Sequence, residues 1–227
     1  MKKFISTVLL TGAAAMLMTA CDDVGTADET SSQDSTAETT QTTTELYIPE
    51  DEMPTERVKD IQSIDDYDYE IIDGSVVITG YTGSASEVEV PAEIDGAPVT
   101  KIGTYAFEAE WDIVSITLPD TITLIGEGAF MDCGSLESIN IPEAVTGIDR
   151  GAFVGCGCLA EITIPAGVQY IREEAFTACE SMTSLTIENP ELAYENWGLE
   201  ELPELVIYAP EDSSAASWAE GMGKLGE

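Results

Sequence analysis

Apolar and polar positions recur along the chain with a period of 23 residues. Strand-like triplets with an apolar first and third residue lie at residues 116–118, 139–141, 162–164 and 185–187, and a proline follows each of the first three. Between the triplets, the same spacing repeats an isoleucine, an Ala-Phe pair, a cysteine and a leucine or methionine. A fixed period of this length predicts a solenoid, because each unit is too small to bury its apolar face alone and packs it against its neighbours.

The alternation inside each triplet predicts which side chains face the interior. Side chains two residues apart in a strand point the same way, so the first and third residues face inward and the middle one faces outward. Every phenylalanine after Phe4 falls in one column, whose rings are expected to stack as an apolar spine. Cysteines form a second inward column, which we interpret as packing. These structural columns are Phe107, Phe130, Phe153 and Phe176, and Cys133, Cys156 and Cys179.

Residues 69–87 are predicted to cap the N-terminal end of the repeats. Two β-rich runs flank the dipeptide Asp73-Gly74, which is a strong signal for a two-residue hairpin turn. A hairpin at this point would cover the open apolar end of the solenoid. The repeats then occupy residues 88–207, and their first copy is five residues longer than the others.

Residues 208–227 are predicted to cap the C-terminal end. The last strand pattern before them returns after 20 residues instead of 23, and Trp197 is expected to fill the space where the phenylalanine column stops. Ser213 has the position of a helix N-cap. The residues that follow carry one apolar stripe at helical spacing, at Ala215, Trp218, Ala219 and Met222.

The N-terminal part of the chain predicts export rather than folding. Residues 1–20 combine a basic start, an apolar run and a small-residue cleavage site, and they resemble a bacterial lipoprotein signal that ends at an acylated Cys21. The alternative is an uncleaved membrane helix, but the apolar run is short for spanning a bilayer. Residues 21–45 are mostly small or polar and are expected to form a disordered, acidic tether. Residues 46–68 are transitional, with a short helix expected over 56–64.

The chain is strongly acidic, with 8 lysine and arginine residues, 44 aspartate and glutamate residues, no histidine and a net charge of −36. Lys2 and Lys3 lie in the predicted signal, so the mature charge would be 6 − 44 = −38. Such a surface repels nucleic acid and anionic lipid, so we expect no nucleic-acid partner and membrane association through the N-terminal lipid only. The acidity suits a solvated surface outside the cell, and the alternative is the capture of cations or of a basic partner.

Residue types that usually carry chemistry are sparse. Without histidine or a C-x-x-C motif zinc is not expected, and the acidic run 65–68 lacks the glycine and ligand spacing of a calcium loop. A serine or cysteine nucleophile lacks its commonest base, and no carboxylate pair stands out as a glycosidase dyad. Cys158 lies outside the cysteine column, and its position leaves open whether it forms a disulfide with a neighbour. We therefore expect no metal, no cofactor and no catalytic site.

Taken together, the columns resemble those of BspA-like leucine-rich repeat proteins, whose 23-residue unit carries a strand, a proline, an isoleucine, an Ala-Phe pair and a cysteine. The resemblance covers residue 69 to the C-terminus, with Glu110 where the first cysteine would stand. It implies a leucine-rich repeat solenoid, a β-rich α/β fold with a parallel β-sheet on the concave face and short helical turns, as at residues 151–156. It also implies a surface-exposed protein of bacteria or certain protists, often linked to adhesion.

We interpret the chain as a lipid-anchored protein at the bacterial cell membrane or cell surface that binds an extracellular protein or glycan without catalysis. The alternative is an extracellular enzyme or accessory subunit that acts on cell-wall or dietary polymers. The predicted binding surface is the outward side of the concave sheet, where mostly short polar side chains form two ladders across the coils. Such residues also suit solvent-facing strand positions through their β-propensity. The ladders consist of Ser115, Thr117, Ser138, Asn140, Glu161, Thr163, Ser184 and Thr186.

Overall fold

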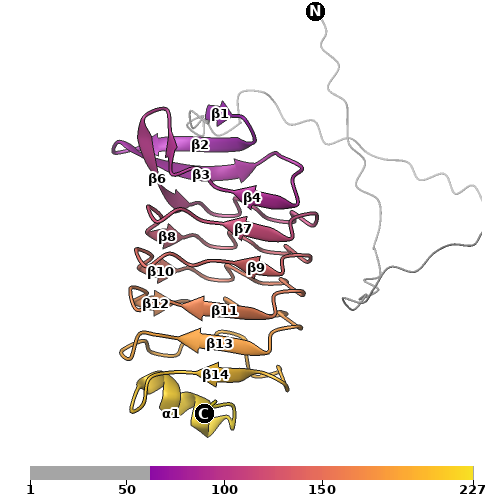
Figure 1. Cartoon of the computed structure of the whole chain (residues 1–227), viewed down its shortest axis with the longest axis vertical. Helices are drawn as coiled ribbons and strands as arrows, with labels where there is room; N and C mark the ends of the chain where they lie inside the picture. The colour runs from indigo at the N-terminus through magenta and orange to yellow at the C-terminus, as the bar shows by residue number, and fades with distance from the viewer. Residues whose placement is uncertain (1–61, 227) are drawn as a thin grey trace, which may run out of the picture. The chain divides into compact units, whose positions relative to one another are not determined.

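The computed structural model describes residues 62–226, which form a solenoid of stacked coils (Figure 1). Parallel strands join successive coils, an antiparallel hairpin lies at the N-terminal end, and one helix lies at the C-terminal end. The predicted fold class is confirmed. The predicted signal peptide, Cys21 and the tether lie outside the described residues. Within the described part, no helix is both long enough and apolar enough to cross a membrane.

Three antiparallel strands cover the N-terminal end of the solenoid, and the predicted hairpin lies between the second and third. Its turn residues Asp73 and Gly74 have φ angles of 52° and 78°, in the left-handed region that a tight two-residue hairpin turn requires. The helix expected over 56–64 is wrong at residues 62–64, because their pairing with the next strand overrides the local preference. The strands are β1 (Gln62–Ile64), β2 (Tyr67–Ile72) and β3 (Ser75–Tyr81).

One side of the coils carries a row of parallel strands, whose solvent-facing surface we call the strand face. Paired residues are 23 apart between the second and third of these strands (138 − 115), as the period predicts. The first two are 28 apart (115 − 87), because the longer first copy includes β5 (Glu93–Ile94), which forms a second hairpin with β6 (Ala97–Ile102). The row consists of β4 (Glu87–Glu89), β7 (Ser115–Thr117), β9 (Ser138–Ile139), β11 (Glu161–Ile164), β13 (Ser184–Ile187) and β14 (Val206–Tyr208).

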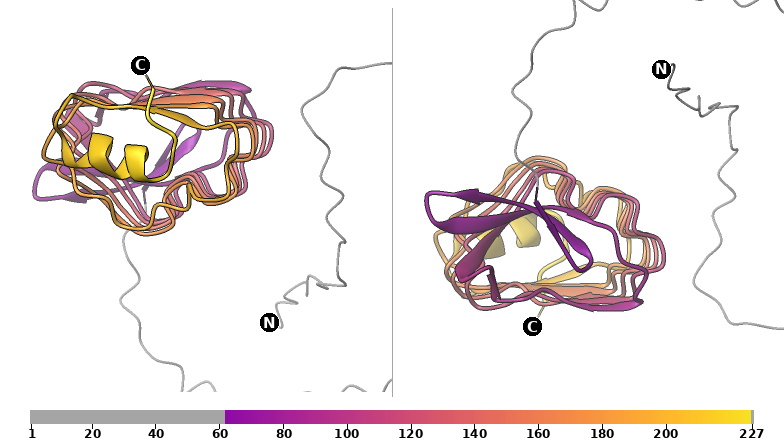
Figure 2. Two further views of the ribbon diagram at one scale, coloured as in Figure 1. Left: turned by 90° about the horizontal axis from the view of Figure 1, so that it is seen from below. Right: turned by 90° about the horizontal axis from the view of Figure 1, so that it is seen from above.

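A second row of short parallel strands joins the coils beside the first, and the cap continues this row through the pairing of β3 with β6. The expected helical turn at residues 151–156 consists of hydrogen-bonded turns and not of a helix, because Gly151 and Gly155 take left-handed φ angles of 63° and 75°. Seen along the solenoid axis, the coils superimpose as a flattened ring (Figure 2). The row consists of β6, β8 (Leu124–Ile125), β10 (Gly147–Ile148) and β12 (Tyr170–Ile171).

A column of stacked aromatic rings runs through the interior and confirms the predicted spine. The four phenylalanines after Phe4 are fully buried, and neighbouring ring centroids lie 5.3–5.5 Å apart. Tyr81 of β3 extends the stack, 5.3 Å from Phe107, which the sequence pattern did not predict. The three cysteines of the second column are also fully buried. Each thiol donates to the carbonyl of the phenylalanine one coil earlier, at 3.0–3.2 Å.

The last coil departs from the period in a different way from the one predicted. β14 pairs with β13 at an offset of 22 residues (207 − 185), with Leu185 opposite Ile207, and not at an offset of 20. Leu199 follows Phe176 by 23 residues and is fully buried.

Helix α1 (Ser214–Gly221) closes the C-terminal end of the ring (Figure 2). Ser213 is its N-cap, as predicted, and the Ser213 hydroxyl accepts a hydrogen bond from the Ala216 amide at 2.9 Å. The indole ring of Trp218 on the helix packs edge-on against Trp197, with ring centroids 5.6 Å apart. Trp197 itself is fully buried, so these two indoles fill the last coil below the phenylalanine column.

Candidate functional site

The eight residues predicted to form a binding surface all lie on the strand face. Each is exposed or half-buried, whereas the residues that alternate with them are buried or packed against the core. Ser115 stands opposite Ser138 in the neighbouring coil, and Thr163 stands opposite Thr186. The structure therefore brings the predicted residues together in two rows that cross the coils.

The two rows extend beyond the predicted residues at both ends. Glu87 and Glu89 of β4 begin them, with Glu89 opposite Thr117. Tyr208 of β14 stands opposite Thr186 and is 42% exposed. The alternation in β4 could have revealed the two glutamates, whereas the irregular spacing of the last coil hid the tyrosine.

The sheet under the strand face is interrupted between β9 and β11. Strands β4, β7 and β9 form one sheet and β11, β13 and β14 form another, and no backbone hydrogen bond joins β9 to β11 among residues 62–226. Where the ladder is regular, the Ser138 amide donates to the Val114 carbonyl at 3.3 Å, and the Ser184 amide donates to the Ala160 carbonyl at 3.2 Å. The equivalent amide of Glu161 has no such partner in the preceding coil.

Asn140 lies beside this interruption, and its side chain bonds to the preceding coil. Its side-chain oxygen accepts a hydrogen bond from the Leu118 amide at 2.7 Å, and its side-chain nitrogen donates to the Leu118 carbonyl at 2.9 Å. In the regular ladder the acceptor is a backbone carbonyl, as where Val90 donates to Thr117. Pro142 has no N–H to offer to the Leu118 carbonyl, whereas Glu188 at the equivalent position donates to the carbonyl of Ile164 in its preceding coil. The Asn140 side chain therefore makes the two hydrogen bonds to Leu118 that backbone groups make elsewhere in the ladder. β9 ends after two residues.

A groove of about 370 Å³ opens where β9 and β11 part. Ile139 and Ile141 face inward but are only half-buried, whereas Ile162 and Ile164 of β11 are 4% and 0% exposed. The groove thus has an apolar floor and a polar rim. Six of the eight predicted binding residues line it: Ser138, Asn140, Glu161, Thr163, Ser184 and Thr186.

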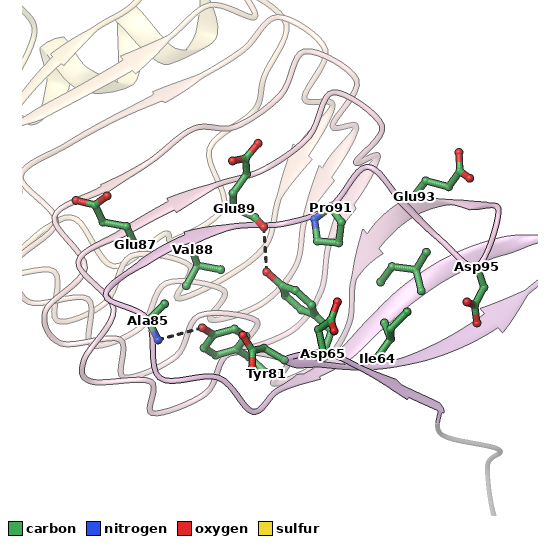
Figure 3. A pocket seen from close by; sticks show the side chains of 13 residues that line it. Ile64, Asp65, Tyr81, Ala85, Glu87, Val88, Glu89, Pro91, Glu93 and Asp95 are labelled. Atoms are coloured by element: carbon green, nitrogen blue, oxygen red, sulfur yellow. Dashed lines mark hydrogen bonds between the residues drawn. The ribbon is translucent and has the colours of Figure 1, made fainter.

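A second hollow, of about 450 Å³, lies between the N-terminal cap and the first coil (Figure 3). The rings of Tyr67 and Tyr81 lie 5.6 Å apart at its base. The Tyr67 hydroxyl donates to the Glu89 carbonyl at 3.0 Å, and the Tyr81 hydroxyl accepts from the Ala85 amide at 3.3 Å. Burial, followed by nearby Tyr81 and acidic groups, raises the pKa of Tyr67 to about 12. The phenol therefore stays neutral at physiological pH and keeps its hydrogen bond.

Carboxylates surround this second hollow, and the acidic run 65–68 contributes two of them. They are Asp65, Asp66, Glu87, Glu89, Glu93 and Asp95. None of the four described lysine and arginine side chains lines the hollow or the groove. The arrangement attracts positively charged groups. Within residues 62–226, however, no group of three or more histidine, cysteine, aspartate or glutamate side chains is placed to hold a metal ion.

The buried thiols serve packing rather than chemistry. Desolvation raises the pKa of Cys133 and of Cys179 to about 12, and it raises the pKa of Cys156 well above its ordinary value. The thiolate is the form that attacks electrophiles and binds metals, so these thiols are inert in the folded protein. Cys158 lies outside the column and is half-buried.

Residues 86–196 match a family model described as the BspA type leucine rich repeat region, in six copies. Among solved structures, the T. pallidum leucine rich repeat protein is similar over 64% of this chain and 69% of its own, with 29% identity and a TM-score of 0.60. A leucine-rich repeat protein from Bacteroides capillosus is similar over 57% of this chain and 99% of its own, with 31% identity and a TM-score of 0.52. No curated protein matches the chain.

Proposed function

This chain belongs to the BspA-type leucine-rich repeat family, and we propose that it is a non-catalytic binding protein of the bacterial cell surface. A lipid on Cys21 holds it at the membrane, and an extracellular protein or glycan binds the strand face. Proteins of this repeat type are typically surface or binding proteins. The fold supplies an extended scaffold, and the ligand depends on the side chains displayed on it.

The observation that carries this proposal is the pair of outward rows on the strand face. Hydroxyl and amide side chains repeat from coil to coil at the same two strand positions. A ligand that lies across several coils can therefore collect similar hydrogen bonds from each. The half-buried Ile139 and Ile141 add an apolar contact at the centre of the face.

Two features support binding without catalysis. The chain contains no histidine, which removes the commonest general base. The three buried thiols are protonated in the fold, so none of them is a ready nucleophile. Both features favour a recognition surface over an active site.

The acidic surface supports a location outside the cytoplasm. A net charge of −36 keeps the chain soluble and weakens contact with anionic lipid. Attachment through a lipid on Cys21 would then leave the strand face available to ligands.

Screening the purified protein on arrays of glycans and extracellular-matrix proteins tests the proposal. For any ligand found, we expect Asn140→Arg with Thr163→Arg to weaken binding, because both changes add bulk and charge at the centre of the strand face. The matched control is Thr146→Arg with Gln169→Arg, which makes the same charge change at exposed positions beside β10 and β12.

Two results would contradict the proposal. Unchanged binding by a folded strand-face variant would move the site elsewhere. Release of soluble fragments from cell-wall or dietary polymers by the purified protein would favour an enzyme.

A further inference from the structure

A further hollow lies at the C-terminal end of the solenoid, between β14 and α1 (Figure 1), and we call it the C-terminal hollow. Its volume is about 650 Å³, compared with about 370 Å³ for the groove on the strand face. Tyr208 and Leu225 line it and are 42% and 40% exposed, so its apolar surface is open to solvent.

The ring of Tyr208 lines the C-terminal hollow because it packs against a glycine. Ile207 pairs with Leu225 in a parallel bridge, so Tyr208 lies opposite Gly226. A Cβ atom at Gly226 would lie only 2.5 Å from Cε1 of Tyr208. Glycine therefore lets the ring rest on the backbone, while the rest of the ring stays exposed.

The other polar side chains of the C-terminal hollow are hydrogen-bond acceptors. Glu211, Asp212 and Glu220 line it and are exposed. The Ser217 hydroxyl donates to the Ser213 carbonyl at 3.1 Å, so only its oxygen remains available, as an acceptor. None of the four lysine and arginine side chains in the described part of the chain lines this hollow. This set of side chains favours a ligand that brings donors and positive charge.

The same chain holds a guanidinium group in a matching arrangement elsewhere. On the second row, Tyr170 lies opposite Gly147, and a Cβ atom at Gly147 would lie 2.2 Å from Cζ of the ring. The guanidinium carbon of Arg172 lies 4.9 Å from the centroid of this ring, and Nε of Arg172 lies 3.6 Å from a carboxylate oxygen of Asp149. A tyrosine packed on a glycine beside a carboxylate is therefore a guanidinium site in this fold. The C-terminal hollow has the tyrosine, the glycine and the carboxylates, but no basic side chain among its described lining residues.

We propose that the C-terminal hollow binds an arginine side chain of a partner protein, with the guanidinium stacked on Tyr208 and paired with the surrounding carboxylates. This inference rests on the function proposed above and names one chemical group of the partner. Tyr208 stands opposite Thr186 at the end of the strand face, so one partner can reach both surfaces. Arginine fits better than lysine, because its planar guanidinium stacks on a ring while its N–H groups bond a carboxylate in pairs. The exposed Leu225 side chain can cover the aliphatic part of the arginine.

Titration of the full-length protein with the capped peptide Gly-Arg-Gly, followed by NMR, tests the site. We expect chemical-shift changes centred on Tyr208, Ser217 and Leu225, with the millimolar affinity of one exposed cation–π contact and one ion pair. The same peptide with citrulline in place of arginine keeps the planar group but loses the charge, so it should bind at least about ten-fold more weakly. Lysine in that place should bind at least about three-fold more weakly, because it lacks the planar group.

Substitutions at the ring test the stacking. Tyr208→Ala should weaken binding of the arginine peptide at least about ten-fold, whereas Tyr208→Phe keeps the ring and should bind within about two-fold of the unmodified protein. Tyr105→Ala is the matched control, because Tyr105 is also 42% exposed and also packs against a glycine, Gly128, but does not line the hollow. This control should leave the affinity unchanged.

Substitutions at the carboxylates test the ion pair. Glu211→Gln with Glu220→Gln should weaken binding of the arginine peptide at least about five-fold, because both carboxylates line the hollow. The matched control is Glu201→Gln with Glu204→Gln, which makes the same charge change at exposed positions outside the hollow. The control should change the affinity by less than about two-fold, since salt screens exposed charges that do not contact the ligand.

Three results would overturn the inference: no shift changes around Tyr208 with the arginine peptide, equal affinity for the citrulline peptide, or unchanged affinity of Tyr208→Ala. Shift changes there with cellohexaose instead of the peptide would also overturn it, in favour of a glycan site.

The proposed function is tested separately by the array ligand. Asn140→Arg with Thr163→Arg lies outside the C-terminal hollow, so it should weaken binding of the array ligand and leave the affinity for the arginine peptide within about two-fold. If the array ligand depends on these two positions but the arginine peptide does not bind the hollow, the strand face stands as a site and the arginine site falls. If the peptide binds the hollow but the array ligand ignores the strand-face substitutions, the strand-face proposal falls instead.

Discussion

The rings of Phe153 and Phe176 lie 5.5 Å apart and within 6° of parallel, although 23 residues separate them along the chain. Phe130 stacks on the other side of Phe153 at 5.3 Å, so the middle ring has an aromatic neighbour above and below. All three side chains are fully buried. A space left at Phe153 would be enclosed by intact coils, which fraying at either end could not collapse.

Phe153→Ala should therefore lower the free energy of unfolding by about 3–5 kcal/mol, the usual range for emptying a buried aromatic site. Denaturant unfolding followed by circular dichroism measures the change. Trp111→Ala is the matched control, because this aromatic side chain is 64% exposed and its loss should change stability by at most about 0.5 kcal/mol. A loss below about 1 kcal/mol for Phe153→Ala would show that the spine contributes little.

The interior of the fold could be predicted from the sequence because each column appears in several copies. A single buried phenylalanine is ambiguous, but four at one spacing identify the period, the inward face and the stacked rings together. The position of Tyr81 could not be predicted, because the N-terminal cap does not follow the 23-residue period. Its ring joins the stack through the tertiary position of β3, only 5.3 Å from Phe107.

The candidate site was predicted only in part, for a different physical reason. The outward direction of Asn140 and Thr163 follows from strand alternation, and the structure confirms that direction. The early end of β9 beside them accompanies two hydrogen bonds from one side chain to the backbone of Leu118. Nothing in the periodic pattern distinguishes an asparagine that replaces a ladder bond from one that points to solvent.

Ser213→Ala tests the C-terminal cap. The Ser213 hydroxyl accepts a hydrogen bond from the Ala216 amide at 2.9 Å, and Ser213 is only 4% exposed. Alanine at this position would leave the Ala216 amide buried without a hydrogen-bond partner. We expect the free energy of unfolding to fall by about 1 kcal/mol. Ser214→Ala is the control, since Ser214 is exposed at the first helical position. Equal effects of the two substitutions in urea unfolding would argue against the cap.

The buried thiols predict how stability changes with pH. Burial raises the pKa of Cys133 and Cys179 to about 12 from the ordinary thiol value of 9.0, and it raises the pKa of Cys156 as well. Below pH 9.0 both the folded and unfolded states keep these protons, so the thiols add no pH dependence. Between the two values the unfolded state binds fewer protons, and the free energy of unfolding therefore falls as the pH rises.

Urea unfolding at pH values between about 8 and about 11.5 measures this slope, which is up to about 1.4 kcal/mol per pH unit for each thiol. Replacing all three cysteines by alanine should flatten the dependence, even though the variant is less stable at every pH. Tyr67, whose pKa is also raised to about 12, leaves a smaller residual slope in both proteins. The same slope in both proteins would mean that the thiols ionise as readily in the folded state as in the unfolded state.

Acylation of Cys21 remains a prediction from the order of a basic start, an apolar run and Met18-Thr19-Ala20 before the cysteine. Cys21→Ala should abolish labelling by a fatty-acid probe in a bacterial host and move the protein out of the mature membrane-anchored form, because the thiol that carries the lipid is gone. Cys133→Ala is the control, since that thiol is buried in the repeats and its loss should leave labelling intact. Membrane labelling that persists in Cys21→Ala would contradict lipid anchoring and favour the uncleaved membrane helix as the anchor.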